Sequence, residues 1–465
     1  MFRDGYFAYK DETKKVLTGI FEEIYELRDE SGNIDIEIPE GVEVIETGTF
    51  EHFGFNTVTL PSSLKTIMDN AFQYTDINKV IFKPGPTEIG NSAFGSAGVK
   101  EVVLSDTITR IGCWTFSCSD IEKIYPLDHI KEIDMYAFEQ SNLKELILPE
   151  NIESIGKSAF THCDELKSVE YKCSCNIPPA LFKHCRELEN VVISGRPAEI
   201  GAQAFLGTNI KSIELPDSLK LIGHSAFHSV PLRTVTIPKS VEVMKDSVFY
   251  DCTDLEEIIF DNPLLAIGSN EFTRTKIPNI IFPKSTRFTG ETCREMPKLK
   301  SVTFTGPVEK IPANFARLSH TLENITFKDN IGIIGENAFK ETSVTKLILN
   351  NVNEIRPQAF SYCTILKELL IGPNTIVYDD AFSNTFNLKQ AILKTDIGAN
   401  EIFGSREDLD VNIISTVQDP DTFSIYYKNN IAKEKPLQEE LEDLLEENVI
   451  SFKDMCKINK LFEER

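Results

Sequence analysis

The sequence has no apolar run that approaches the ~20 residues of a membrane-spanning helix. Its start, MFRDGYFAYKDETKKVLTGI, lacks the uninterrupted apolar core of a secretory signal peptide. We therefore expect no membrane insertion, and we expect the protein to stay in the cytoplasm. The alternative is export by a route that uses no signal peptide, which would place the protein at the cell surface or in the medium.

Basic residues are scarce relative to acidic ones: 48 Lys and Arg stand against 72 Asp and Glu, which gives a formal net charge of -24. Nucleic acids and anionic membranes are bound through clustered Lys and Arg, so neither is an expected partner. The acidity either keeps a long exposed surface soluble, which is the simpler explanation, or favours a basic ligand.

Catalytic motifs are also missing. The sequence has no phosphate-binding glycine loop, no HExxH, no GxSxG, and no nucleophile with an evident nearby base. It therefore predicts neither an enzyme nor a cofactor.

The ten cysteines include no CxxC pair. Four of them occupy one position, three residues after a recurring Phe, where other copies of the pattern have Ala, Ser or Thr: Cys163, Cys185, Cys252 and Cys363. A position that accepts these residue types selects for small size, and free Cys packs well as a small buried hydrophobe. Many unpaired thiols are typical of a reducing compartment.

One stretch carries Cys and His densely enough to be considered as a zinc site. It contains His162, Cys163, Cys173, Cys175, His184 and Cys185. The repeat spacing should stack His162 on His184 and Cys163 on Cys185, but it puts Cys173 and Cys175 on another side. We therefore predict packing and loop roles for these residues, and no metal site.

What the sequence has in abundance is a repeat marked by Phe. The first anchors recur every 22 residues, and the later ones vary by a residue or two: Phe50, Phe72, Phe94, Phe116, Phe138, Phe160, Phe182, then Phe205, Phe227, Phe249, Phe272, Cys293, Phe315, Phe339, Phe360, Phe382 and Phe403. A short unit repeated in this way predicts a solenoid in which the anchors form a buried spine.

Residues 142–160, NLKELILPENIESIGKSAF, show the unit clearly. Leu146 and Leu148 alternate with outward residues, as in a strand, and Pro149 ends that strand. Ile155 stands five residues before the anchor. Gly156 and its equivalents follow the Ile, and we expect them to turn the chain with a positive φ.

The unit LxxLxLPxxLxxIGxxAFxxC resembles the BspA-like leucine-rich repeat, also called the Treponema-type repeat, over about residues 34–413. The resemblance implies a right-handed leucine-rich-repeat solenoid with a parallel β-sheet on its concave side and a role in binding proteins, often in adhesion. The anchors predict about 17 coils, with few regular helices outside a C-terminal cap.

Three regions follow from the extent of the repeat. Residues 1–33 form an N-terminal cap, 34–414 form the solenoid, and 415–465 form a connector and a helical cap. The pattern loosens after Phe272, where Cys293 replaces the anchor Phe and Phe288 replaces the Ile. A kink or a partner site would explain this, but decay of a redundant repeat is simpler.

Two features are candidate partner-binding sites. Outward strand positions form an apolar stripe that begins with Ile81, Val103, Tyr125 and Ile147. Such a stripe is typical of a binding surface, although strands favour β-branched residues in any case. Trp114 and Tyr136 occupy a usually small or polar position in adjacent repeats. They either form an exposed hot spot or pack on a neighbouring turn.

Charged residues lie two positions before the stripe and alternate in sign across four neighbouring strands: Lys79, Glu101, Lys123 and Glu145. We expect these charges to satisfy one another and thus to fix the strand register.

These observations lead to the hypothesis of a non-enzymatic scaffold that recognises a macromolecule, most simply a protein, through the concave face and the edge formed by Trp114 and Tyr136. One alternative is a cell-surface or host-directed adhesin. The other is a structural component that self-associates through its ends or its face.

Overall fold

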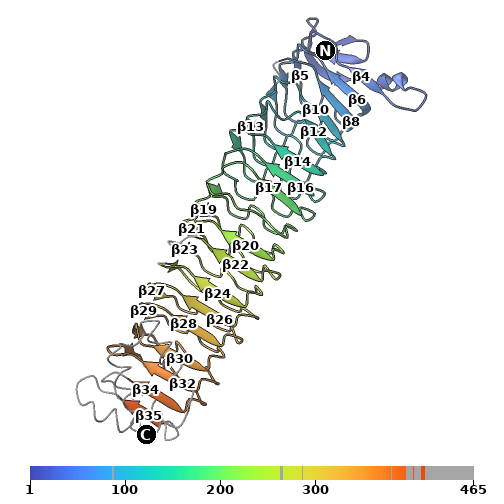
Figure 1. Ribbon diagram of the computed structural model, residues 1–465. Coiled ribbons are helices and arrows are strands. Elements are labelled where there is room, and N and C mark those ends of the chain that lie inside the picture. The colour runs from blue at the N-terminus through green and yellow to red at the C-terminus, as the bar shows by residue number, and fades with distance from the viewer. Residues whose placement is uncertain are drawn as a thin grey trace. The chain divides into compact units, whose positions relative to one another are not determined.

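The computed structural model describes residues 1–85, 88–261, 265–284, 286–378, 380–393, 402 and 410–413. These residues form a solenoid of parallel strands with about 16 turns and almost no helix (Figure 1), as the repeat predicts. The chain divides into an N-terminal unit, Met1–Leu255, and a C-terminal unit, Glu256–Arg465. Phe403 and the predicted helical cap at 415–465 lie outside the described residues.

The N-terminal region is a small antiparallel sheet that leads into the first coil. Strands β1 (Phe2–Asp4), β2 (Phe7–Tyr9) and β3 (Val16–Ile20) pair in chain order, and β3 then pairs in parallel with β5 (Val44–Ile45). The 3-10 helix η1 (Glu22–Leu27) buries Ile24 completely. Its Tyr25 stacks on Phe53 with ring centroids 6.0 Å apart. The segment therefore covers apolar surface of the first coil.

Most coils contribute a first strand, which begins several residues after the anchor and carries alternating buried and outward side chains. In the N-terminal unit these strands are β4 (Asp35–Glu37), β6 (Gly54–Leu60), β8 (Asp76–Phe82), β10 (Glu101–Val103), β12 (Lys123–Tyr125), β14 (Glu145–Leu148), β16 (Ser168–Tyr171), β17 (Asn190–Ile193) and β20 (Thr234–Ile237). In the C-terminal unit they are β22 (Glu257–Phe260), β24 (Asn279–Phe282), β26 (Ser301–Phe304), β28 (Asn324–Phe327), β30 (Lys346–Leu349), β32 (Glu368–Ile371), β34 (Gln390–Leu393) and β35 (Asp410–Ile413). We call the surface that they form the first-strand face.

A second strand in most coils ends at the Ile column, and the sequence pattern did not predict it. In the N-terminal unit these strands are β5, β7 (Thr66–Ile67), β9 (Glu88–Ile89), β11 (Arg110–Ile111), β13 (Glu132–Ile133), β15 (Ser154–Ile155), β18 (Glu199–Ile200), β19 (Leu221–Ile222) and β21 (Val243–Met244). In the C-terminal unit they are β23 (Ala266–Ile267), β25 (Arg287–Phe288), β27 (Val308–Ile311), β29 (Ile331–Ile334), β31 (Val352–Ile355) and β33 (Ile376–Val377). They form the second-strand face. Most of these strands have only two residues, which are too few for alternation to reveal them.

Equivalent residues of successive coils lie side by side on both faces. On the first-strand face Val102 pairs with Val80 on one side and with Ile124 on the other. On the second-strand face Ile133 pairs with Ile111 and Ile155. The register follows the repeat because shifting a strand by one residue would turn its apolar side chains outward.

The anchors fill the interior between the two faces. All predicted anchor Phe residues from Phe50 to Phe382 are buried, with at most 3% of their surface exposed. In the N-terminal unit successive rings stack from Phe50 to Phe249, with centroids between 4.3 Å and 5.8 Å apart. Each ring thus packs on the rings of both neighbouring coils, which gives dispersion contacts beyond simple burial.

Around most of the described anchors the backbone turns through two left-handed residues, two positions before and two positions after the Phe. Around Phe138 these are Tyr136, with φ 58°, and Gln140, with φ 55°. Within the turn, the N–H of Phe138 donates to the carbonyl of Ala159 in the next coil at 2.8 Å. The turn therefore belongs to the same coil-to-coil hydrogen-bond ladder as the strands.

The glycines that follow the Ile column do not supply these turns, so that prediction was wrong. In the described coils the left-handed positions fall on other residues, and Gly156 is not among the residues with positive φ. Gly156 has a different reason to be glycine: a Cβ there would lie 2.2 Å from the backbone nitrogen of Met135 in the preceding coil. The requirement is close backbone approach rather than a special φ.

Where Ser, Thr or Cys stands three positions after an anchor, the residue is buried and its side chain is hydrogen-bonded. Thr208 donates its hydroxyl to the carbonyl of Phe205 at 2.9 Å, within its own coil. Cys163 and Cys185 donate their thiols to the carbonyls of Phe138 and Phe160 in the preceding coils, at 3.1 Å and 3.0 Å. The column thus selects small size, as predicted, and also a donor for a buried carbonyl oxygen.

The spine changes register in the C-terminal unit. The N–H of Cys293 donates to the carbonyl of Phe315, and that of Ala316 donates to the carbonyl of Ala338. These bonds place Ala316 in the anchor position and Phe315 one position before it, so Phe315 is buried but is not the anchor that the sequence predicts. Phe288 stands in the Ile column, and its ring packs on Phe315 with centroids 5.1 Å apart and an angle of 79° between the ring planes. The aromatic packing persists with edge-to-face contacts instead of parallel stacking.

Phe138→Asp tests the spine. The variant removes a ring stacked on Phe116 and Phe160 and buries a carboxylate without a partner. We expect a loss of more than about 3 kcal/mol, measured as a lower denaturation midpoint, because large-to-small core changes alone cost that much. Lys157→Asp, an acid placed on the exposed surface of the same region, is the control. Equal unfolding of the two variants would show that Phe138 is not in the core.

Gly156→Ala tests the close-approach explanation. The added methyl group must displace the Met135 backbone, so we expect a loss of about 1–3 kcal/mol in urea unfolding. Gly54→Ala is the matched control, because its nearest contact would be 3.7 Å away. It should be neutral or slightly stabilising. A neutral Gly156→Ala would contradict the explanation.

Candidate binding surfaces

The predicted stripe lies on the first-strand face, and in the N-terminal unit its first members are in register. Ile81, Val103 and Tyr125 pair directly across β8, β10 and β12. Ile81 and Val103 are half-buried, whereas Tyr125 and Ile147 are 43% and 55% exposed. The stripe is therefore most accessible at Tyr125 and Ile147.

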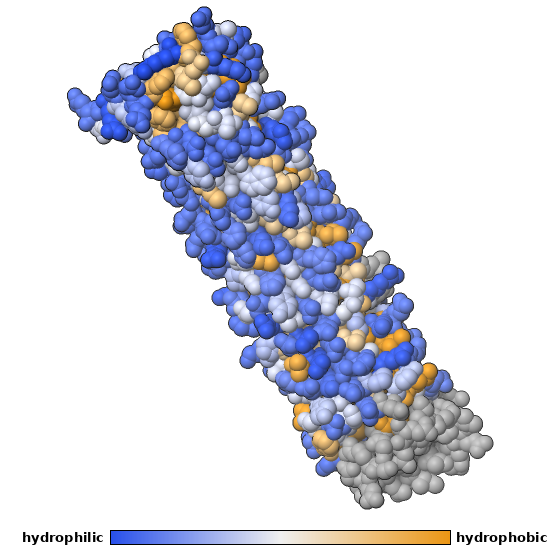
Figure 2. All heavy atoms as spheres, turned by 180° about the vertical axis from the view of Figure 1, so that it is seen from behind, coloured by the Kyte–Doolittle hydropathy of each residue, from blue (hydrophilic) through white to orange (hydrophobic). Residues whose placement is uncertain are grey.

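The stripe is interrupted in both units. In the N-terminal unit Glu170 lies between Ile147 and Val192 in the pairing of β14, β16 and β17. In the C-terminal unit Thr303 pairs with Ile281, and the next strand continues with Thr326. One side of the surface is mostly hydrophilic, with hydrophobic residues in separate small patches (Figure 2). The strand register itself shows that the first-strand face carries local apolar segments rather than one continuous band.

Charges beside the stripe are paired in part, as their alternation suggests. Lys79 forms an ion pair with Glu101 at 2.8 Å, and the Tyr125 hydroxyl also donates to Glu101. The hydrogen bond to Lys79 lowers the pKa of Glu101, and the bond to Glu101 raises the pKa values of Lys79 and Tyr125. These contacts hold Tyr125 against its neighbours and neutralise the surrounding charge.

Trp114 and Tyr136 form an exposed stacked pair, which we call the aromatic platform. Their ring centroids are 5.4 Å apart and the rings are nearly parallel, at 3°. Trp114 is 40% exposed and Tyr136 is half-buried. The sequence left exposure and packing open, and the structure shows both: the rings pack on each other and still face solvent.

The platform owes its position to the left-handed turn. Trp114 and Tyr136 have φ values of 53° and 58°, in the column where Ser92 and Ser158 stand in the coils on either side. The turn lies between the second strand of one coil and the first strand of the next. The platform and the stripe therefore belong to different segments of the coil.

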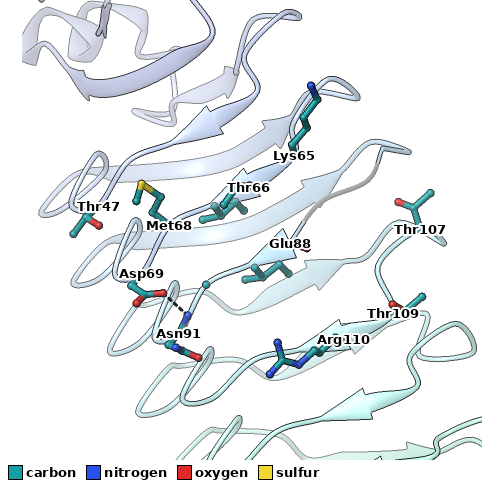
Figure 3. A pocket seen from close by; sticks show the side chains of 13 residues that line it. Thr47, Lys65, Thr66, Met68, Asp69, Glu88, Asn91, Thr107, Thr109 and Arg110 are labelled. Atoms are coloured by element: carbon teal, nitrogen blue, oxygen red, sulfur yellow. Dashed lines mark hydrogen bonds between the residues drawn. The ribbon is translucent and has the colours of Figure 1, made fainter.

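An open groove on the second-strand face, of about 890 Å³, was not predicted from the sequence. It crosses β7, β9 and β11 (Figure 3). Met68, Asp69 and Asn91 lie at its end near the turns, and Thr107 and Thr109 lie at the other end. Its residues come from four coils, so no contiguous motif could have indicated it.

Both cations of the groove are paired. Lys65 contacts Glu43 at 2.7 Å, and together with Lys15 it holds the pKa of Glu43 at about 2. Arg110 contacts Asp134 at 2.5 Å in the next coil. Asp69 accepts a hydrogen bond from the backbone N–H of Asn91 at 2.8 Å. The groove thus offers hydrogen-bonding groups without an uncompensated cation.

A family model, the BspA type leucine rich repeat region, matches residues 28–134, 65–187, 175–296 and 289–406. The chain belongs to the BspA-type leucine-rich repeat family. The resemblance carried by the Phe, Ile and Leu columns is thereby confirmed. Proteins with this repeat are generally non-enzymatic scaffolds, typical of protein interaction or of surface adhesins.

Solved structures similar to this BspA-type chain include bacterial repeat proteins. A leucine-rich repeat protein from Bacteroides ovatus is 22% identical with a TM-score of 0.57, and the match covers 88% of this chain and 98% of that one. A leucine-rich cell surface protein from Faecalibacterium prausnitzii is 20% identical with a TM-score of 0.31, covering 87% and 98%. The pneumococcal vaccine antigen PcpA is 17% identical with a TM-score of 0.32, covering 92% and 96%. At these identities the likeness to the Bacteroides protein supports the fold alone.

No curated protein matches the sequence. Within the part of the chain that the structure describes, no helix has the length and apolarity to cross a membrane.

The His and Cys residues of the BspA-type coils are spread as the spacing predicts. The His162 and His184 rings stack at 5.0 Å, while Cys163 and Cys185 are buried in the adjoining interior. Among the described residues no group of three or more His, Cys, Asp or Glu side chains is arranged to hold a metal ion. The nine described cysteines are free thiols.

Cys173, Cys175 and Tyr171 form a separate cluster after β16. The Tyr171 hydroxyl donates to the carbonyl of Asn176 at 3.1 Å and lies 3.3 Å from the Cys175 sulfur. A hydrogen bond from the Cys173 thiol lowers the pKa of Cys175 to about 7. The same bond, together with burial, raises the pKa of Cys173. Cys175 is therefore the thiol of this pair that ionises first.

Alkylation by iodoacetamide, followed by peptide mass spectrometry across pH 5.5–9, tests this assignment. Only the thiolate reacts with iodoacetamide. The alkylation rate of Cys175 should therefore rise with pH around a midpoint of about 7, compared with about 8.5 for an ordinary thiol. Cys173→Ala removes the donor and should return the rise towards higher pH. A rise near pH 8.5 in the parent protein would refute the assignment.

Proposed function

We propose that this protein is a non-enzymatic scaffold that binds another protein through the first-strand face of its N-terminal unit. The observation that carries the proposal is the exposure of large apolar side chains there: Tyr125, Ile147 and Val192 are 43%, 55% and 57% exposed. Exposed apolar residues grouped on one face are typical of interaction surfaces. Aromatic and aliphatic anchors of this kind supply most of the binding energy in protein interfaces.

Rigidity supports this assignment. Each exposed side chain stands on a strand whose neighbours are paired in fixed register, as Ile147 stands on β14 beside β16. When a partner binds such a surface, few additional rotatable bonds of the scaffold become immobilised. The loss of conformational entropy that opposes association is therefore small.

Polar surroundings also fit an interface. The Lys79, Glu101 and Tyr125 contacts lie beside the apolar positions, and Glu170 separates Ile147 from Val192. An interface commonly has apolar residues at its centre and hydrogen-bonding groups around them. A partner that complements both the apolar positions and Glu170 would be preferred over one that is merely hydrophobic.

We further propose that the protein works in the cytoplasm. Buried free thiols such as Cys163, Cys185, Cys252 and Cys363 support a reducing compartment. An adhesin role is the alternative that the family suggests. Surface protease treatment of intact cells separates the two, because digestion of the protein would place it outside the cell and contradict the cytoplasmic assignment.

The interface test compares two double variants. Ile147→Glu with Val192→Glu places charges on the first-strand face, and Leu27→Glu with Ile376→Glu places the same charges on two exposed apolar residues outside that face and outside the groove. Each purified protein is incubated with extract of the source cells, and retained proteins are quantified by mass spectrometry. We expect the Ile147 and Val192 variant to retain at least one protein roughly tenfold less than the parent does, because two apolar contact residues are lost. The control variant should retain that protein as well as the parent does.

Equal retention by both double variants would overturn the assignment to this face. Light scattering of the parent protein provides a second check. If it is a dimer that only the Ile147 and Val192 variant dissociates, the face binds a second copy of the chain, and self-assembly replaces partner binding.

A further inference from the structure

The groove on the second-strand face and the aromatic platform are neighbours. Asn91 lines the groove near the turns, and the next residue, Ser92, is the platform-column residue of that coil. Ser92 donates its N–H to the carbonyl of Cys113, the residue before Trp114, at 3.0 Å. A Cβ on Gly112 would lie 3.5 Å from the Asn91 side-chain oxygen. The coil that carries Trp114 therefore packs directly on the coil that lines the groove.

The open side of the platform faces the groove coil. Tyr136 covers one face of the Trp114 ring, and the other face lies towards the coil of Ser92. A serine side chain is too short to cover an indole, which agrees with the 40% exposure of Trp114. Since adjacent coils are separated by about 4.8 Å, a flat group of ring thickness fits over this indole face.

The polar groups of the groove fit hydroxyl groups better than ions. Asp69 and Glu88 present carboxylates, and Asn91 presents an amide. Lys65 and Arg110 are neutralised by Glu43 and Asp134, so no free cation would select a phosphate or a carboxylate. The net charge of -24 further disfavours anionic ligands. Two carboxylates and an amide in a groove whose coil packs against that of an exposed aromatic ring match a molecule with hydroxyl groups around an apolar ring face.

We propose that the groove and the aromatic platform form one binding site for a neutral oligosaccharide. One sugar ring stacks on the open face of Trp114, and the hydroxyl groups of the adjoining sugars bind Asp69, Asn91 and Glu88. A peptide fits less well, because Met68 is the one strongly exposed apolar side chain among the described groove residues. Peptide recognition relies on apolar pockets or free strand edges. This site is independent of the first-strand face.

The chain provides its own probe, because Trp114 is its only tryptophan. The intact protein is titrated with neutral oligosaccharides of glucose, mannose, galactose and N-acetylglucosamine while tryptophan emission is recorded. Sialylated and sulfated oligosaccharides and an arginine-rich peptide are titrated in parallel. We expect a saturable change in emission with at least one neutral oligosaccharide and none with the charged ligands.

Variants assign the signal to the site. Asp69→Asn and Glu88→Gln keep the fluorophore and should weaken the emission titration. Trp114→Ala is measured by calorimetry, and we expect about a tenfold loss of affinity, as removal of one stacked ring implies. Tyr362→Ala is the control, because Tyr362 is also an exposed aromatic residue in a left-handed turn, with φ 59°. Its affinity and the melting temperatures of all variants should match the parent.

Three results would overturn the proposal. They are the absence of binding by every neutral oligosaccharide, unchanged affinity of Trp114→Ala, and binding confined to the charged ligands or to the peptide. None of them bears on the interface test of the first-strand face, which uses different residues and a protein partner.

Discussion

Each coil is held by hydrogen bonds to the coils beside it, and this ladder includes the turns as well as the strands. The bond from the Phe138 N–H to the Ala159 carbonyl shows the arrangement: the anchor's own backbone is fixed by the neighbouring coil. Two left-handed residues around most of the described anchors make this geometry possible. The stacked rings, the hydrogen-bonded Thr and Cys column and the paired strands all depend on equivalent residues meeting in register.

Much of the fold was predictable because burial repeats with the unit. The spacing of the Phe anchors predicts the spine, and the alternation around Leu146 and Leu148 predicts the first strands. Most second strands were missed because their two residues carry no periodicity. Gly156 was assigned to a turn when its constraint is the Met135 backbone of another coil, and Phe315 was taken for an anchor because its neighbour Ala316 has no ring to mark the position. In each case the deciding contact lies between coils.

The candidate sites divide in the same way. One repeat length separates Trp114 from Tyr136, so their proximity followed from the sequence, but their exposure depends on the turn that presents them. The stripe residues were identified from their position in the repeat. Only the structure shows that Ile147 is exposed whereas Ile81 is half-buried. No sequence motif indicated the groove, because its residues come from different coils. Its ion pairs also join different coils, as the pair between Arg110 and Asp134 shows.

The left-handed turn column has a consequence for how such a protein can change. At these positions the backbone is set by hydrogen bonds to the next coil, and Asn70, Ser92, Trp114, Tyr136 and Gln203 all adopt the same conformation. Where the side chain of this column is exposed, as at Trp114, its size is not constrained by core packing, so changing one residue can add or remove a surface group while the spine is untouched. The column acts as an evenly spaced set of interchangeable positions, and a new specificity can be assembled along it one coil at a time.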